Sequence, residues 1–295
     1  MNSTAQFKET VWDYYAKCAR DLPWRTPEAN GSYDPYKILV SEMMLQQTQV
    51  QRVIPKYREF LKKFPNIEAL ARAPLSDVIK CWQGLGYNRR VKYLHMASKQ
   101  VMNDFEGNIP RDILELELLP GIGKNTAGAI CAYAYNQPVS FIETNIRSVY
   151  IYYFFKNVEE VHDKDILLLV DKSIQLISCW EEQPEIRINS VPGALRNPDG
   201  VSQYREWYWA LMDYGTYLKS HIGNTSRKSK TYSKQSRFEG SVRQIRGTIL
   251  KMLSSGSQSY NQLHNKVNDD RLDNVLLDLE NEGFIIKQKL LYQLV

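Results

Sequence analysis

The sequence contains few cysteines and no long apolar run. Its four cysteines, Cys18, Cys81, Cys131 and Cys179, lie far apart and form no CxxC pair. This spacing does not match a metal site, so we expect reduced thiols that mostly line the core. No segment reaches the roughly 18 uninterrupted apolar residues of a membrane-spanning helix, and the N-terminus lacks a basic stretch followed by an apolar one. We therefore expect a soluble, intracellular protein.

Sustained alternation of polar and apolar residues is absent before residue 280, which argues against a β-rich core. Apolar residues recur instead at helical spacing. Helices are predicted at 3–19, 36–61, 67–72, 76–83, 90–105, 111–119, 124–136, 149–155, 165–180 and 207–215. The polar segment 181–203, with several Pro and Gly residues, is predicted to be a long surface loop that is either functional or flexible.

Residues 241–295 have the pattern of a separate small domain. Three short helices followed by two strands, 284–288 and 290–295, give the outline of a winged helix, whose third helix often enters the DNA major groove. Here the third helix carries six acidic residues against Arg271, and DNA phosphates would repel it. We therefore expect a structural or protein-contacting role for this domain.

The positive charge is concentrated in one segment. The chain has 38 basic and 33 acidic residues, a net charge of +5, and residues 219–246 contain eight basic residues against one acid. Charge runs are usually solvated linkers. A run interleaved with Ser, Thr, Tyr and Asn can also follow a phosphate backbone, with an affinity that falls steeply with salt.

The stretch from Leu118 to Arg147 combines a glycine turn with an isolated acid. Gly121 and Gly123 remove side chains at a helix start, where backbone N–H groups can approach a phosphate closely. Glu143 stands further along, between apolar and polar neighbours. Taken alone, the pattern is more often a helical hairpin with a surface acid.

Four motifs together resemble the helix-hairpin-helix (HhH-GPD) base-excision DNA glycosylases, most of all their A/G-specific adenine glycosylase (MutY) branch. They are LPWR at 22–25, SEMMLQQTQV at 41–50, WQGLGYNRR at 82–90 and LPGIGKNTAGAI at 119–130. The resemblance covers residues 5–218 and implies an all-α, two-domain HhH-GPD fold with a DNA-binding cleft between the domains. One domain would comprise 1–30 and 137–218, which carries an iron–sulfur cluster in relatives, and the other the six-helix region 31–136. A basic segment, 219–240, and the winged-helix-like unit, 241–295, would follow.

The resemblance also implies an activity. It predicts a DNA glycosylase of base excision repair that hydrolyses the N-glycosidic bond of adenine mispaired with guanine or 8-oxoguanine. Its partner would be double-stranded DNA with a mismatched or damaged base pair, bound by a monomer in the cytoplasm (nucleoid) or in a nucleus. No membrane partner is expected.

Two acids match the catalytic positions of the family. Glu42 matches the acid that protonates the leaving purine, and the apolar neighbours Met43, Met44 and Leu45 could keep its proton in place near neutral pH. Glu143 matches an aspartate that, as an ionised carboxylate, stabilises the positive sugar. Opposed protonation states of two acids follow the logic of glycoside hydrolysis.

Other matched positions contact DNA. Gln47 and Tyr87 match residues that wedge into the duplex beside the flipped base, whose vacated stack needs a filler. The implied base pocket further includes Arg25, Leu45, Thr48, Asn125 and Asn145. The implied phosphate contacts are Gly121, Gly123 and Lys124, with a bound monovalent cation at this turn, and we add Arg227, Lys228 and Lys230 of the basic segment.

The chain departs from the family pattern at several positions. Asn125 replaces the lysine of the lyase relatives, so a Schiff base cannot form there and a monofunctional glycosylase is implied. Glu143 is one methylene longer than the usual aspartate. The four cluster cysteines fall, in an ungapped register, at Lys219, Ser226, Ser229 and Gln235, none of which provides a thiolate, so we expect no iron–sulfur cluster and no other cofactor.

Two alternatives stay open. A thymine or uracil mismatch glycosylase of the same fold uses similar motifs, although LQQTQV and TAGAI favour adenine. A non-catalytic protein that binds mismatched DNA is compatible with Glu143 and with a winged-helix-like unit in place of the Nudix-like domain that reads 8-oxoguanine, whereas Glu42 argues against it.

Overall fold

The computed structural model describes residues 4–178 and 203–295. They form two compact units. The first unit contains 4–38, 111–114, 122–178 and 203–234, and the second contains 39–110, 115–121 and 235–295. The predicted loop 181–203 lies, apart from Gln203, outside the described residues. None of the helices within the described ranges combines the length and apolar composition needed to cross a membrane.

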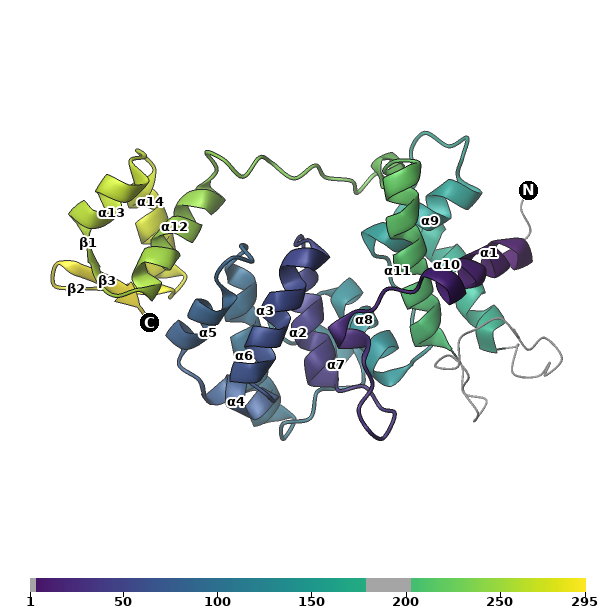
Figure 1. The fold of residues 1–295 in the computed structure, drawn as a ribbon, viewed down its shortest axis with the longest axis horizontal. Coiled ribbons are helices and arrows are strands. Elements are labelled where there is room, and N and C mark those ends of the chain that lie inside the picture. Colours follow the sequence, from purple (N-terminus) through teal and green to yellow (C-terminus); the bar gives the residue numbers. More distant parts are fainter. Residues whose placement is uncertain (1–3, 179–202) are drawn as a thin grey trace. The chain divides into compact units, whose positions relative to one another are not determined.

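Helices form the first unit, as the sequence predicts. They are α1 (Thr4–Cys18), η1 (Pro23–Arg25), α8 (Lys124–Tyr135), α9 (Thr144–Phe154), α10 (Asp163–Ser178), α11 (Tyr204–His221) and η4 (Thr225–Lys228). α11 packs against α1 and α9, and α9 also packs against α10 (Figure 1). Phe7 of α1 is fully buried, with its ring centroid 5.3 Å from that of Tyr150 and 5.8 Å from that of Trp207. An aromatic cluster therefore forms the core of this unit.

The predicted end of α11 near Gly215 is wrong, because the helix continues to His221. A Cβ atom at Gly215 would lie 2.5 Å from the backbone oxygen of Asn145. The glycine thus allows α11 to approach the first turn of α9 closely and does not end the helix.

The second unit contains helices followed by a small sheet. Its elements are α3 (Val50–Lys63), α4 (Ile67–Arg72), α5 (Leu75–Trp82), α6 (Arg89–Asp104), α12 (Val242–Ser254), β1 (Gln258–Ser259), α13 (Tyr260–Val267), α14 (Leu272–Asn281), β2 (Ile285–Gln288) and β3 (Leu291–Leu294). Helices α2 (Pro35–Leu45) and α7 (Ile113–Glu117) have residues in both units. The prediction of one helix over 36–61 is wrong, since the chain leaves the helix at 46–49.

The three C-terminal helices and the hairpin are present. Ser259 begins α13 with a capping box to Gln262, and β2 and β3 pair antiparallel, with Ile285 opposite Leu294. β1 adds a third strand, in the order β1-β3-β2. β1 is not predicted from the sequence, because two residues are too few to show alternation.

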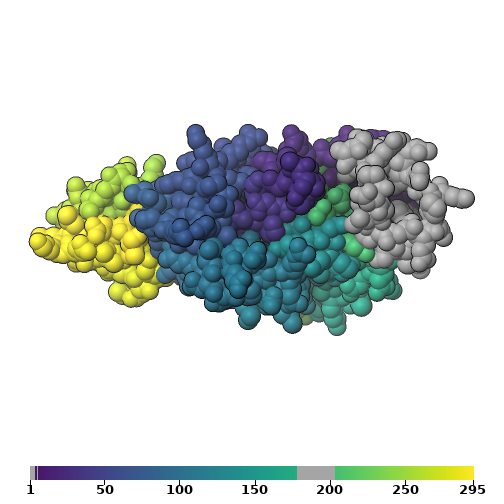
Figure 2. Space-filling model, turned by 90° about the horizontal axis from the view of Figure 1, so that it is seen from below, coloured from purple at the N-terminus to yellow at the C-terminus, as the bar shows by residue number. Residues whose placement is uncertain are grey.

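The C-terminal residues dock on the helices of the same unit. Glu282 accepts hydrogen bonds from Arg89 (2.7 Å) and Arg246 (2.6 Å), and its backbone oxygen accepts one from Lys92. Partial burial alone would raise the pKa of Glu282, but the two guanidinium groups lower it to about 2. α12 packs against α5, so that the C-terminal part, in yellow, lies beside the blue segment (Figure 2). The domain boundaries expected from the sequence stay predictions.

Candidate functional site

Helix α2 carries Glu42 and several buried apolar side chains. Leu39, Val40, Met43 and Met44 of this helix are at most 1% exposed, and Glu42 is half-buried. The catalytic role of Glu42, and the effect of its apolar neighbours on its proton, stay predictions.

Arg90 ends helix α2. Its Nη1 donates hydrogen bonds to the backbone oxygens of Met43 (2.8 Å), Met44 (2.8 Å) and Gln46 (2.6 Å). These carbonyl groups lie at the end of the helix, where no N–H group of a further turn is available. The buried guanidinium takes the place of that turn, which explains why the chain leaves the helix after Leu45.

The same guanidinium holds a second turn. Its Nη2 donates to Thr48 Oγ1 (3.0 Å) and to the backbone oxygens of Leu85 (3.3 Å) and Gly86 (3.1 Å). Arg90 therefore links the turn that contains Gln47 to the turn that contains Tyr87. Burial lowers its pKa to about 10, which leaves it charged at neutral pH.

No role for Arg90 is predicted from the motif that contains it. A signal was present, because Arg90 precedes Leu94, Ala97 and Val101 on the apolar stripe of α6, and all four residues are buried. A charged residue on such a stripe needs buried partners.

Gln47 and Tyr87 share an uncommon backbone conformation. Their φ angles are 55° and 47°, in the left-handed region that non-glycine residues rarely adopt. Such strain costs about 1 to 3 kcal/mol per residue and is concentrated at functional sites. Gln47 is exposed and Tyr87 is half-buried.

Tyr87 is held by charged and polar side chains. The guanidinium carbons of Arg90 and Arg243 lie 5.4 Å and 5.0 Å from its ring centroid. Its hydroxyl oxygen accepts hydrogen bonds from Arg243 Nη1 and Gln235 Nε2. No local sequence pattern connects Arg243 or Gln235 to the turn of Tyr87, so these two contacts are not predicted from the sequence.

Glu143 is the N-cap residue of α9. Burial raises the pKa of its carboxyl group, while the N–H of Thr144 and the charges of Arg147 and Lys219 oppose this shift. Burial in turn lowers the pKa of Lys219, and the charge of Glu143 raises it. The acid therefore lies in the field of two cations, on α9 and α11.

Arg147 shares its charge with Asp163. Its Nε and Nη2 donate to the two carboxylate oxygens at 2.9 Å and 2.8 Å. Ser229 Oγ (3.2 Å) and Thr231 Oγ1 (3.1 Å) donate to the same carboxylate. Hydrogen bonds from Arg147 therefore lower the pKa of Asp163 despite its partial burial. This network holds the segment that follows η4.

The basic residues near η4 differ in their surroundings. Arg227 is exposed, whereas Lys228 donates to the backbone oxygen of Lys156 at 2.6 Å. Lys230 forms an exposed ion pair with Glu160 at 3.7 Å. Exposed pairs of this kind contribute at most about 1 kcal/mol, so the contact with Glu160 holds Lys230 only weakly.

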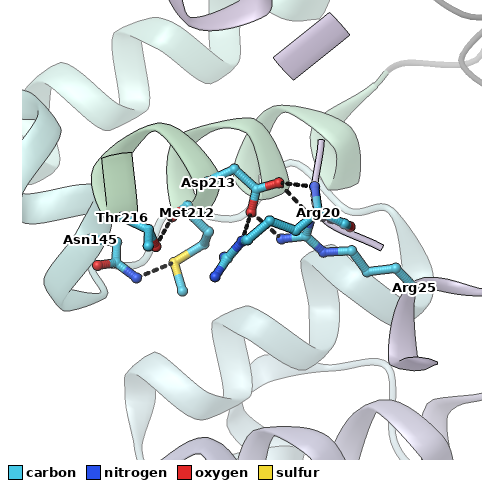
Figure 3. A network of polar contacts seen from close by, with 6 residues as sticks. All are labelled: Arg20, Arg25, Asn145, Met212, Asp213 and Thr216. Carbon is cyan, nitrogen blue, oxygen red and sulfur yellow. Dashed lines mark hydrogen bonds and ion pairs between the residues drawn. The ribbon is translucent and has the colours of Figure 1, made fainter. Parts of the chain in front are cut away.

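Arg25 is bound by a buried acid. Its Nη1 and Nη2 donate to Asp213 Oδ2 and Oδ1, both at 2.8 Å, and Arg20 Nε donates to the same carboxylate at 2.6 Å (Figure 3). The Arg25 and Asp213 side chains are 8% and 0% exposed. This gives Arg25 a structural partner on α11 that the sequence analysis missed, and its place in the base pocket stays a prediction.

The remaining predicted positions lie at helix starts and turns. Asn145 is half-buried in the first turn of α9, and Asn125 is exposed on α8, where its side-chain oxygen accepts the N–H of Ile142 at 3.4 Å. Gly123 is the N-cap of α8, and Lys124 after it is exposed. Gly121 has a φ of 78°, and a Cβ atom there would lie 2.6 Å from Cβ of Tyr93.

The positions that correspond to cluster cysteines do not fit a cluster. Ser226 Oγ donates to Asn224 at 2.5 Å, Ser229 Oγ is bound to Asp163, and Lys219 and Gln235 offer an amine and an amide. Within the described part of the chain, no three His, Cys, Asp or Glu side chains are grouped to hold a metal. Thiolates, which ligate such clusters, are missing from all four positions.

The chain is similar to a known protein family and to individual members of known function. Residues 40–175 match the HhH-GPD superfamily base excision DNA repair protein family. The chain is 38% identical over 173 residues to the adenine DNA glycosylase of Buchnera aphidicola subsp. Baizongia pistaciae. The matched region covers 58% of this chain and 48% of that protein. The chain is also 41% identical over 136 residues to the adenine DNA glycosylase of Mycobacterium tuberculosis. That match covers 46% of this chain and 43% of the relative. The chain thus matches about half the length of these relatives.

Solved structures share the fold. A thermostable thymine-DNA glycosylase superposes with a TM-score of 0.57 and 24% identity, over 75% of this chain and 90% of that chain. A trapped endonuclease III–DNA covalent intermediate superposes with a TM-score of 0.51 and 15% sequence identity. This superposition covers 79% of this chain and 88% of that chain. At these identities the likeness concerns the fold alone, and the expected helical HhH-GPD fold is confirmed.

Proposed function

We propose that the chain is a DNA glycosylase that removes adenine mispaired with guanine or 8-oxoguanine, on the basis that residues 40–175 match the HhH-GPD superfamily of base excision DNA repair proteins. The similarity to adenine DNA glycosylases supports the substrate. Double-stranded DNA containing the mismatch is the proposed partner.

The observation that carries the proposal is the double role of Arg90. One buried side chain ends the helix of Glu42 and fixes the turns of Gln47 and Tyr87. A base-excision enzyme must place an acid and a duplex-opening residue on a rigid frame, because the extruded base leaves a gap in the stack. Arg90 supplies such a frame within one unit.

The proposed reaction divides the chemistry between two carboxyl groups. Glu42 donates a proton to the purine ring, so that a neutral base leaves. The glycosidic bond breaks with positive charge on the sugar, and the ionised Glu143 stabilises that charge. Water then adds to the sugar and gives up a proton, which restores the acid form of Glu42 through the solvent, and an abasic site remains. The longer side chain of Glu143, compared with aspartate, requires its backbone to stand further from the sugar.

We propose that the enzyme stops at base removal. Asn125 carries an amide where lyase relatives carry an amine, and an amide cannot form a Schiff base with the abasic sugar. The chain would also work without an iron–sulfur cluster, with Arg227, Lys228 and Lys230 contacting phosphates, and the monovalent cation expected at the LPGIG turn remains part of this proposal.

The test uses four duplexes, with A opposite 8-oxoguanine, A opposite G, T opposite G and U opposite G. The purified chain is incubated with each, and half of every sample is treated with alkali. We expect strand breaks with both A-containing duplexes, only after alkali, and none with Glu42→Gln. Breaks without alkali would contradict the role given to Asn125.

A second candidate function is the excision of thymine or uracil mispaired with guanine, because glycosylases of the same fold use sequence motifs similar to those of this chain. Breaks confined to the T·G and U·G duplexes would replace the adenine assignment by this one. Binding without breaks, unchanged in Glu42→Gln, would identify a non-catalytic mismatch-binding protein.

A further inference from the structure

We propose that Arg243, a residue of the C-terminal helix α12, is a positioning residue that holds Tyr87 ready to enter a DNA duplex. This inference rests on the proposed function, because it takes Tyr87 as the residue that fills the vacated stack. It gives the winged-helix-like unit a direct role at the DNA site.

The contact joins residues that are 156 positions apart in sequence and lie in the same unit. Arg243 touches Tyr87 twice: its Nη1 donates to the hydroxyl oxygen, and its guanidinium carbon lies 5.0 Å from the ring centroid. Gln235 Nε2 donates to the same hydroxyl oxygen. Both lone pairs of the hydroxyl are thus engaged by side chains from the C-terminal part.

Tyr87 needs such a restraint. Its φ of 47° lies where a tyrosine is strained, and the flanking Gly86 (φ 70°) leaves the turn with few side-chain contacts of its own. Arg90 fixes the base of this turn through the backbone oxygen of Gly86. Arg243 fixes the far end, the hydroxyl group, so that the side chain is held at both ends.

Arg243 is itself fixed. Its Nη2 donates to Ser236 through the backbone oxygen (2.7 Å) and Oγ (3.1 Å), and to the backbone oxygen of Arg237 (3.4 Å). Helix α12, which carries it, is anchored to α6 because Arg246 and Arg89 share Glu282. The guanidinium therefore has little freedom, as a positioning group requires.

The consequence is preorganisation. A side chain already held in its working conformation loses less entropy on binding, so affinity for the opened duplex rises. Arg243 should therefore favour mismatched DNA, where Tyr87 enters the stack, more than matched DNA, where it does not. A residue that only contacted phosphates would favour both equally.

The first measurement needs no DNA. 3-Fluorotyrosine is placed at position 87 of the full chain, and the ¹⁹F line shape is compared between wild type, Arg243→Ala, Arg243→Lys and Arg237→Ala. We expect a mobile ring, seen as a narrowed and shifted line, in Arg243→Ala. Arg243→Lys, which keeps a donor and a charge, should recover most of the wild-type signal. Arg237→Ala, which removes a neighbouring charge, should leave it unchanged.

The second measurement is the ratio of dissociation constants for matched and A·8-oxoguanine duplexes, in a Glu42→Gln background that prevents turnover. Arg243→Ala and Tyr87→Phe should each reduce this ratio by about five-fold, the size expected for one lost hydrogen bond. Because both variants remove the hydrogen bond between Arg243 and the Tyr87 hydroxyl group, the double variant should reduce the ratio by clearly less than the product of the two single effects. Arg237→Ala should weaken the binding of both duplexes by the same factor and leave the ratio unchanged.

The outcomes separate the two proposals. An unchanged or increased ratio in Arg243→Ala, or multiplied effects in the double variant, would overturn the positioning role while leaving the proposed function in place. If the Glu42→Gln chain, with Arg243 and Tyr87 intact, bound matched and A·8-oxoguanine duplexes equally tightly, the proposed function would be overturned. The use of Tyr87 in the duplex would be overturned with it. An unchanged ¹⁹F line in Arg243→Ala would show that Arg243 does not restrain the ring.

Discussion

Asp213 holds the guanidinium of Arg25 through two hydrogen bonds of 2.8 Å, and the carboxylate is fully buried. The pair ties η1 to α11 in the core of the first unit. Removing one partner of such a pair leaves a buried charge without compensation, which costs about 3 to 5 kcal/mol.

Asp213→Asn should therefore lower the free energy of unfolding by about 3 kcal/mol or more. Urea titration followed by circular dichroism measures the change. Glu159→Gln, which alters an exposed acid in the same unit, is the control and should stay within about 0.5 kcal/mol of wild type. A loss for Asp213→Asn as small as that of the control would show that the buried pair stabilises nothing.

Asp163 should make stability depend on pH. Its folded-state pKa is lowered by Arg147, so its contribution is present above the unfolded pKa of about 4 and is lost as the pH falls through the lower folded value. Asp163→Asn should be less stable than wild type at pH 7, and the difference should shrink below about pH 4. Urea unfolding at a series of pH values measures this. Equal pH dependence in both chains would contradict it.

Lys219 should set the acid side of the activity profile. The ionised form of Glu143 is the proposed working form, and burial raises its pKa, so excision should fall as the pH falls through that value. Lys219→Met removes a positive charge that lowers the pKa of Glu143. The other nearby cation, Arg147, is already paired with Asp163. In Lys219→Met, the acidic side of the pH profile of the single-turnover excision rate should therefore move to higher pH. Lys219→Arg, which keeps the charge, should restore the wild-type profile.

The control for that experiment is Lys172→Met, an exposed lysine of α10 whose loss should leave the limb in place. A direct readout is the ¹³C titration of the Glu143 carboxyl group, assigned with Glu143→Gln. An unchanged titration in Lys219→Met would show that Lys219 does not act on this acid, whatever the activity.

The basic residues near η4 should determine the salt dependence of DNA binding. Replacing Arg227, Lys228 and Lys230 by Ala should flatten the slope of log affinity against log salt by up to about 2.7, since each phosphate contact contributes about 0.9. Fluorescence anisotropy between low and physiological salt measures the slope. A variant with three other exposed lysines replaced, at 164, 172 and 251, provides the control for charge. Equal slopes in the two triple variants would rule out a special role of this segment.

Sequence patterns predicted most helices because helix formation is local. The segment 67–72 was placed to the residue, and 124–136 nearly so, from apolar spacing and flanking Gly, Pro and Asn. The break after Leu45 was missed, because it depends on Arg90, whose bond to the Gln46 oxygen spans 44 positions. A periodic pattern contains no information about such a distant cap.

The candidate site was predictable to the extent that it lies within motifs. Glu42, Gln47 and Tyr87 were singled out from residues beside them in sequence. The residues that hold them, Arg90 and Arg243, act across the fold. Long-range hydrogen bonds depend on tertiary packing, which a pattern over a few residues does not encode.

The double role of Arg90 also constrains the order of events during protein synthesis. The carbonyl groups of Met43 and Met44 receive the side-chain donor of Arg90 only when Arg90 has left the ribosome, and α6 must form to bury it. A nascent chain that stops before residue 90 lacks the guanidinium that joins the end of α2 to the turn of Tyr87. The site of this protein is therefore completed late, by a residue that a ribosome adds well after the acid it supports.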